Sequence, residues 1–109
     1  MERRQHRRVS TRVKSLLRAN SHKVEGKAID LSMGGARIES SLDVEPGKSI
    51  VVKLLMPGDD VPIVIEQAQV QWSVDRTFGV RFLDVQQQDR DELEALIDEY
   101  IVLDEGKGT

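Results

Sequence analysis

The chain has no cysteine among its 109 residues. This absence excludes disulfide frameworks, thiolate zinc sites and catalysis by a thiol. Long hydrophobic runs are missing too: the longest, residues 50–55 and 62–65, are far shorter than the roughly 20 residues that span a bilayer. The charged N-terminus is followed by no signal-type apolar stretch. We therefore expect a cytoplasmic protein without membrane insertion.

Aromatic residues are scarce, at 4%, whereas hydrophobic residues make up 39% and charged residues 32% of the chain. The apolar residues are spread along the whole sequence, which favours a globular chain over a disordered one. A chain of this length fits one compact domain that buries roughly two-thirds of its unfolded surface. A second full domain does not fit.

The net charge is only −3, but the two ends of the chain differ in sign. Residues 1–18 contain seven lysines and arginines and a single acid, Glu2, whereas residues 84–105 contain nine acids and a single cation, Arg90. A basic arm beside a mildly acidic body favours a small anionic ligand. DNA or RNA would need a basic surface wider than one segment, so we expect neither as a partner.

The hydrophobic pattern divides the chain into three parts. Residues 1–8 have no aliphatic side chain after Met1 and are predicted to form a flexible basic arm. Residues 9–103 are expected to form one domain, and residues 104–109 a tail. Short strand-like runs separated by turn residues are typical of a barrel. The expected strands are 13–18, 24–29, 36–39, 49–56, 63–73 and 78–82.

Beyond Asp84 the apolar period changes from two to 3.6 residues, which predicts an amphipathic helix. Its apolar stripe consists of Leu93, Leu96, Ile97, Tyr100 and Ile101. The fold class expected from these patterns is all-β dominated: a six-stranded antiparallel β-barrel with a C-terminal α-helix. The helix needs an apolar surface to cover, most simply an open end or a face of the barrel.

Two short motifs lie at junctions of this pattern. The first is the arm, Arg3-Arg4-Gln5-His6-Arg7-Arg8, and the second is the loop, Asp30-Leu31-Ser32-Met33-Gly34-Gly35. Together they resemble the PilZ family of cyclic di-GMP receptors, whose signature is Arg-x-x-x-Arg followed by Asp/Asn-x-Ser-x-x-Gly. Arg4 and Arg8 match the first element. Asp30, Ser32 and Gly35 match the second, and the strand order with a C-terminal helix is also similar to that family.

The resemblance implies cyclic di-GMP as the ligand and no further cofactor. An arginine guanidinium can donate two parallel hydrogen bonds to a phosphate or to the O6 and N7 atoms of guanine. The candidate ligand-binding residues in the arm are therefore Arg3, Arg4, Arg7 and Arg8. The carboxylate of Asp30 offers acceptors to guanine N1 and N2, which adenine cannot match. In the family, an extra arginine such as Arg3 bears on whether one ligand or an intercalated pair is bound, and we expect a pair.

Three further candidates come from the loop. The hydroxyl of Ser32 can contact the base or phosphate while fixing the loop through its backbone. Gly34 and Gly35 are expected to permit positive φ and a close approach of the backbone to the ligand.

Two side chains outside the motifs have alternative interpretations. Trp72, the only tryptophan, either stacks on a guanine or belongs to the core, because it shares strand parity with Ala68 and Val70. Arg37 is either a third phosphate contact or a solvated side chain.

Three functions remain open at this point. The first is a cyclic di-GMP receptor and adaptor whose arm folds over the ligand and changes the surface offered to a protein partner. The second is a PilZ-like protein-interaction module that binds no nucleotide. The third is a nucleic-acid binder, which the acidic helix opposes. We expect no enzyme and no metal site, since His6 and His22 lie in separate segments. The protein is expected to be a monomer or a homodimer.

Overall fold

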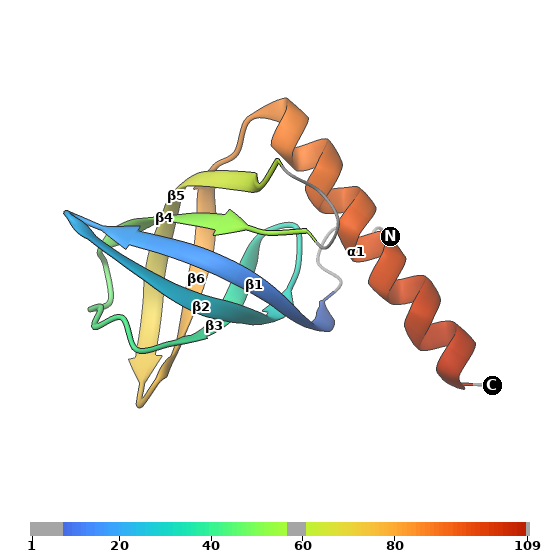
Figure 1. The fold of residues 1–109 in the computed structure, drawn as a ribbon, viewed down its shortest axis with the longest axis horizontal. Coiled ribbons are helices and arrows are strands. Elements are labelled where there is room, and N and C mark those ends of the chain that lie inside the picture. Colours follow the sequence, from blue (N-terminus) through green and yellow to red (C-terminus); the bar gives the residue numbers. More distant parts are fainter. Residues whose placement is uncertain (1–7, 57–60, 109) are drawn as a thin grey trace.

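The computed structural model describes residues 8–56 and 61–108, with side chains as far as residue 100. Six strands precede one helix (Figure 1). The elements are β1 Val9–Ala19, β2 His22–Leu31, β3 Gly35–Ser40, β4 Ser49–Leu54, β5 Ile63–Val74, β6 Thr77–Asp84 and α1 Gln87–Gly108.

The six strands form a closed antiparallel barrel in the order β1-β2-β3-β6-β5-β4. The barrel closes where β1 pairs with β4, for example at Leu17 and Val52. Two hairpin turns contain non-glycine residues with left-handed backbone, Asn20 at φ 58° and Asp75 at φ 56°. Asparagine and aspartate tolerate this conformation better than most residues. The predicted fold class is therefore confirmed.

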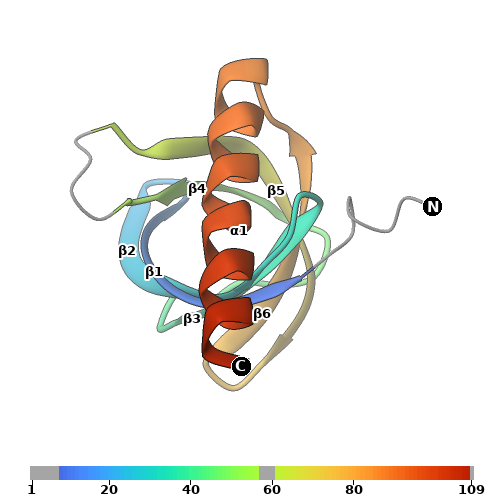
Figure 2. The ribbon, with the colours of Figure 1, turned by 90° about the vertical axis from the view of Figure 1, so that its right-hand side faces the viewer.

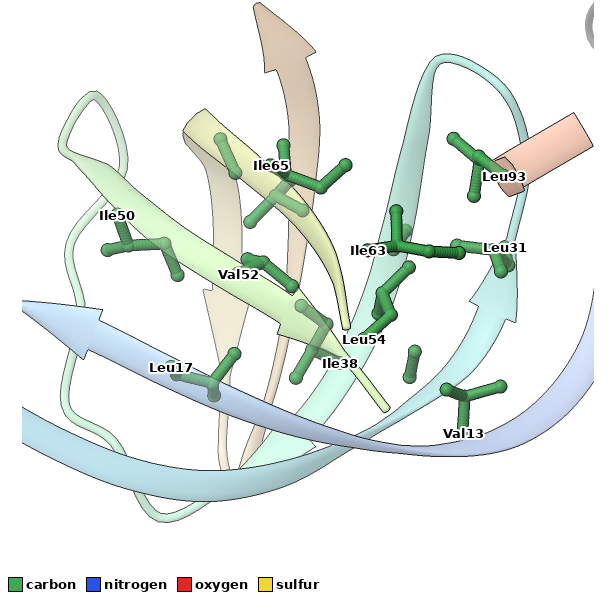
Figure 3. Close-up of a cluster of buried hydrophobic side chains, with 14 of the residues drawn as sticks. Val13, Leu17, Leu31, Ile38, Ile50, Val52, Leu54, Ile63, Ile65 and Leu93 are labelled. Carbon is green, nitrogen blue, oxygen red and sulfur yellow. The ribbon is translucent and has the colours of Figure 1, made fainter. Parts of the chain in front are cut away.

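Strict alternation along the strands fills the barrel interior. From Val9 to Arg18 every second residue of β1 is buried and the others are exposed, as expected for a strand with one face on the core. The inward side chains come from all six strands and are almost entirely aliphatic (Figure 3). The labelled members of this cluster are Val13, Leu17, Leu31, Ile38, Ile50, Val52, Leu54, Ile63, Ile65 and Leu93.

Helix α1 lies across one open end of the barrel (Figure 2). Leu93, Leu96 and Ile97 are buried, which confirms the predicted apolar stripe over these residues. The Asp89 carboxylate also accepts a hydrogen bond of 3.0 Å from the backbone N–H of Val64 in β5. Because Val64 lies at the start of β5, the bond ties the helix to the rim that it covers.

The helix is longer than expected. It continues to Gly108, so residues 104–108, which the sequence pattern assigned to a tail, are helical. Each residue added to an existing helix gains a hydrogen bond without a new nucleation step, so a helix can outlast its apolar stripe. No helix in the described part of the chain is long and apolar enough to cross a membrane.

Candidate ligand-binding site

The site begins with a bulge in β2. Ala28 pairs with Ile38 of β3, but Asp30 pairs with Arg37, so Ile29 is an extra residue on β2. Such a bulge inverts the alternation of the strand beyond it. Asp30 would otherwise share the inward face with the buried Ala28. The bulge turns Asp30 to the outside of the barrel.

Asp30 lies between two arginines. Its Oδ2 atom is 3.6 Å from Nη2 of Arg37 and 4.0 Å from Nη1 of Arg8. The Asp30 side chain is 18% exposed, whereas both arginine side chains are about half exposed. The two guanidinium groups therefore keep donors free toward solvent, and Arg8 lies next to the second motif, as the sequence predicted.

A second bulge, in β5, positions the tryptophan. Val70 pairs with Val80 of β6 but Trp72 pairs with Gly79, which leaves Gln71 as the extra residue. The inversion turns Trp72 outward, and it is 40% exposed. The interpretation of Trp72 as a core residue is therefore wrong, because the extra residue in the bulge turns Trp72 away from the inward face on which Val70 lies.

The two bulges complete one row of outward positions across four strands. Neighbours in the row are Asp30 and Arg37, then Arg37 and Gly79, then Gly79 and Trp72. Gly79 has no side chain, and the indole of Trp72 lies over it: a Cβ at position 79 would lie 2.4 Å from Nε1 of Trp72. The indole thus lies close against the sheet beside the charged cluster.

The loop between β2 and β3 is held by its own hydrogen bonds. The backbone N–H of Ser32 donates to the Gly35 carbonyl at 2.9 Å, and the Ser32 hydroxyl donates to the same carbonyl at 3.2 Å. That hydroxyl also accepts from the N–H of Gly34 at 3.3 Å. Ser32 is buried, and its hydrogen bonds fix the loop in this structure. Its expected contact with a base or phosphate stays a prediction.

The expected role of the two glycines needs correction. Neither Gly34 nor Gly35 has a positive φ; among described glycines only Gly47 does. Gly35 is required for another reason, because a Cβ there would lie 2.3 Å from the Val80 carbonyl oxygen in β6. A Cβ on Gly34 would meet open space. The Gly34 carbonyl accepts a 2.8 Å hydrogen bond from the N–H of Phe82, which fixes the loop to β6.

These elements surround one open hollow of about 350 Å³. Its charged lining consists of three arginines and one carboxylate, and the indole forms part of its apolar wall. The lining residues are Arg8, Asp30, Gly34, Gly35, Ala36, Arg37, Gln71, Trp72, Gly79, Val80 and Arg81. Three guanidinium groups around one carboxylate suit an anionic ligand with a planar ring system.

A sequence model described as the PilZ domain matches residues 2–99. The chain belongs to the PilZ domain family. No curated protein matches it in sequence.

Solved structures share this fold at low sequence identity. Bacillus subtilis MotI/DgrA, an inhibitor of motility, is 16% identical with a TM-score of 0.75, and the match covers 94% of this chain and 53% of that protein. This PilZ chain thus spans about half the length of MotI/DgrA. The PilZ domain of CeSA from a cellulose-synthesizing bacterium is 16% identical with a TM-score of 0.65, covering 90% and 98% of the two chains. An uncharacterized Legionella protein is also 16% identical, with a TM-score of 0.59 and coverage of 94% and 99%.

Within this PilZ domain, the structure brings most of the sequence-predicted site residues together. Arg8, Asp30, Gly34, Gly35 and Trp72 all line the hollow. Ser32 is buried and is hydrogen-bonded to the two loop glycines. The other predicted arginines, Arg3, Arg4 and Arg7, lie outside the described residues.

The PilZ hollow also contains Arg37, for which a phosphate contact was one of two interpretations, and Arg81, which was not a predicted site residue. Arg37 reaches Asp30 through their cross-strand pairing, and Arg81 pairs with Gly35 on one side and Gln69 on the other. Alternation around Arg37 indicated an exposed side chain but no partner. Nothing in the sequence assigned a role to Arg81, because the pairing of β6 with β3 is long-range. Among described residues, no group of histidine, aspartate and glutamate is arranged to hold a metal ion.

Proposed function

We propose that this PilZ domain is a receptor for cyclic di-GMP that binds in the hollow between β2, β3, β5 and β6. This proposal depends on one observation, the row of residues from Asp30 to Trp72 across four strands, with Arg8 and Arg81 at its sides. This row gathers guanidinium donors, a carboxylate acceptor and an aromatic plane in one place. A guanine dinucleotide needs all three.

Each group has a separate task in the proposal. The guanidinium groups of Arg8 and Arg81 donate to the phosphates or to guanine O6 and N7. Asp30 accepts from guanine N1 and N2 when its bond to Arg37 loosens. The exposed face of Trp72 stacks on one guanine. Arg4 completes the Arg-x-x-x-Arg pair with Arg8, and Arg3 and Arg7 add donors that favour two intercalated ligands.

The proposed output is a change in the arm. Arg8 immediately precedes β1 and holds Asp30 at 4.0 Å, a long ion pair that a phosphate can replace. When the ligand recruits the arm, the surface offered to a protein partner changes. In this proposal the chain acts as an adaptor in the cytoplasm and not as an enzyme. A PilZ domain that binds only protein is the alternative.

Calorimetry separates the two functions. We expect saturable binding of cyclic di-GMP with two ligands per chain, and at least tenfold weaker binding of cyclic di-AMP, which lacks the N1 and N2 donor pair. Arg4→Ala should lose tenfold to a hundredfold in affinity, whereas Arg90→Ala on the exposed side of α1 should be unchanged. No binding by the folded wild-type chain would support the protein-interaction module and overturn the receptor. One ligand per chain would remove only the intercalated pair.

A further inference from the structure

The outer face of β2, β1 and β4 is strongly basic. Six cations point outward from these strands, and all are exposed, against one exposed acid, Glu25. The other outward acid, Asp30, is only 18% exposed and is paired with arginines at the end of β2. The cations are Arg12, Lys14, Arg18, Lys23, Lys27 and Lys53. We call these six residues, with Leu16 at their centre, the basic face.

Strand register makes the basic face continuous. Leu16 of β1 pairs directly with Glu25 on one side and Lys53 on the other. The row on one side of it contains Lys14 and Lys27, and the row on the other side contains Arg18 and Lys23. Directly opposed residues lie about 5 Å apart at Cβ, so five cations surround the exposed leucine within two strand spacings.

This concentration contrasts with the charge of the whole chain, which is −3. The exposed side of α1 has the opposite sign, with Asp91, Glu94 and Asp98 pointing to solvent. The molecule is therefore electrically polarised, and a negatively charged surface attracts it in only one orientation. In barrel order β1 is three strands from β6, so the centre of the basic face on β1 and β4 lies away from the β5 and β6 part of the candidate ligand site, while β2 contributes residues to both surfaces. Figures 1 and 2 show β1 and β6 on opposite walls.

The composition of the basic face favours a partner whose negative charge is spread over a surface. Four of its six cations are lysines, which act as hydrated point charges. Lysine lacks the paired N–H donors with which arginine binds one carboxylate or base. Lysine is depleted at protein interfaces, which are rich in aromatic residues, and this face has none. Binding to single-stranded nucleic acid also depends on aromatic stacking. Leu16, 40% exposed, supplies an apolar side chain amid the charges.

We propose that the basic face docks this protein on the surface of an anionic phospholipid bilayer. Lysine and arginine clusters of this size bind acidic lipid surfaces by additive electrostatic attraction, and an exposed leucine inserts among the headgroups. The nearby hollow between β2 and β3 is no specific headgroup pocket, because Glu25 and Glu39 line it together with Lys14 and Lys27. The contact is therefore with the surface as a whole and does not depend on cyclic di-GMP.

Vesicle sedimentation tests the proposal. The full chain should bind vesicles of phosphatidylcholine with phosphatidylglycerol at low salt and lose this binding near 0.5 M salt, but it should not bind phosphatidylcholine alone. The double variant K14E/K53E should bind the anionic vesicles at least tenfold more weakly. K48E/R90E changes the net charge equally at two exposed sites outside the six cations of the basic face and should bind like the wild type. Circular dichroism checks that both variants are folded.

Three results would overturn the proposal. One is equal vesicle binding by K14E/K53E and K48E/R90E, since then only net charge matters. Another is no difference between neutral and anionic vesicles, including the case of no binding to either. The third is tighter binding of the wild type to a DNA or RNA oligonucleotide than to anionic vesicles at the same salt, which would assign the face to nucleic acid. The Leu16→Ala variant should weaken vesicle binding severalfold in the supporting case.

Discussion

Asp30 contacts two arginines from different parts of the chain, and this arrangement fixes where its carboxylate points. Arg37 holds it along the sheet at 3.6 Å, while Arg8 approaches from the start of β1 at 4.0 Å. All three side chains are partly exposed, so removing one of them leaves no buried unpaired charge. Substitutions here should therefore change ligand binding far more than stability.

Asp30→Ala and Arg8→Ala should each weaken cyclic di-GMP binding tenfold to a hundredfold, about 1.5 to 3 kcal/mol, because each removes a charge-assisted contact. Titration calorimetry measures the affinity, and thermal unfolding should shift little. Arg90→Ala serves as the matched arginine control. Wild-type affinity in both folded variants would contradict the assignment of these residues.

Trp72 gives the site its own optical probe, because it is the only tryptophan in the chain. If a guanine stacks on its exposed face, excitation of tryptophan should show fluorescence quenching that saturates with the ligand. Trp72→Ala should weaken binding by about 1 to 3 kcal/mol, the usual contribution of one base stacked on an aromatic ring. Saturable binding in calorimetry with unchanged tryptophan emission would exclude stacking.

At the scale of the elements, two glycines limit how β3, β5 and β6 approach one another, and they should respond differently to substitution. A Cβ at position 79 meets the indole of Trp72, a side chain that can move outward. A Cβ at position 35 meets the backbone carbonyl of Val80, which cannot move without disturbing the sheet. The first contact concerns the binding surface and the second concerns the fold.

Gly79→Ala should therefore displace Trp72, weaken cyclic di-GMP binding at least fivefold and leave the unfolding free energy nearly unchanged. Gly35→Ala should destabilise the barrel by about 1 to 3 kcal/mol, as overpacking does in closely packed interiors. Urea unfolding and calorimetry on the two variants measure both quantities. A larger stability loss in Gly79→Ala than in Gly35→Ala would contradict this division.

Helix α1 is attached to the barrel by a small number of buried side chains. Leu93 is fully buried and points into the cluster at the barrel end (Figure 3). Leu93→Ala should cost about 2 to 5 kcal/mol in unfolding free energy, the range for a leucine removed from a closed core. Ala95, on the exposed side of the same helix, provides the control, and Ala95→Ser should change stability by less than about 1 kcal/mol. Equal effects of the two variants would show that the helix does not pack as described.

At the scale of the molecule, the proposed ligand site and the basic face share β2, but Lys14 and Lys53 of the basic face lie on β1 and β4, which contribute none of the residues that line the site. Charges farther apart than the Debye length, about 8 Å at physiological salt, influence each other weakly. K14E/K53E should therefore keep its cyclic di-GMP affinity within about twofold, and Asp30→Ala should keep its vesicle binding. Calorimetry and sedimentation on both variants check this independence. A loss of both activities in either folded variant would show that the two surfaces are coupled.

Much of this architecture is predictable from the sequence because it depends on local patterns. Period-two alternation around Val70 and Val80 and turn residues on both sides of Val52 identify strands, and the 3.6 period around Leu93 identifies the helix. The resemblance of the two motifs to the PilZ signature is enough to predict that Arg8 and Asp30 are neighbours. The core is harder to assign at strand ends, where parity alone leaves Trp72 between the interior and the surface.

The sequence by itself determines the class of the barrel, the helix that closes it and the two motifs from which we propose an anionic ligand, since these follow from alternation and motif order. Only the tertiary structure decides that Asp30 and Trp72 face outward, that Arg37 and Arg81 join them, and that six cations form one surface. The physical reason is strand register: single extra residues at Ile29 and Gln71 invert a strand's faces, and pairings between distant strands choose the neighbours.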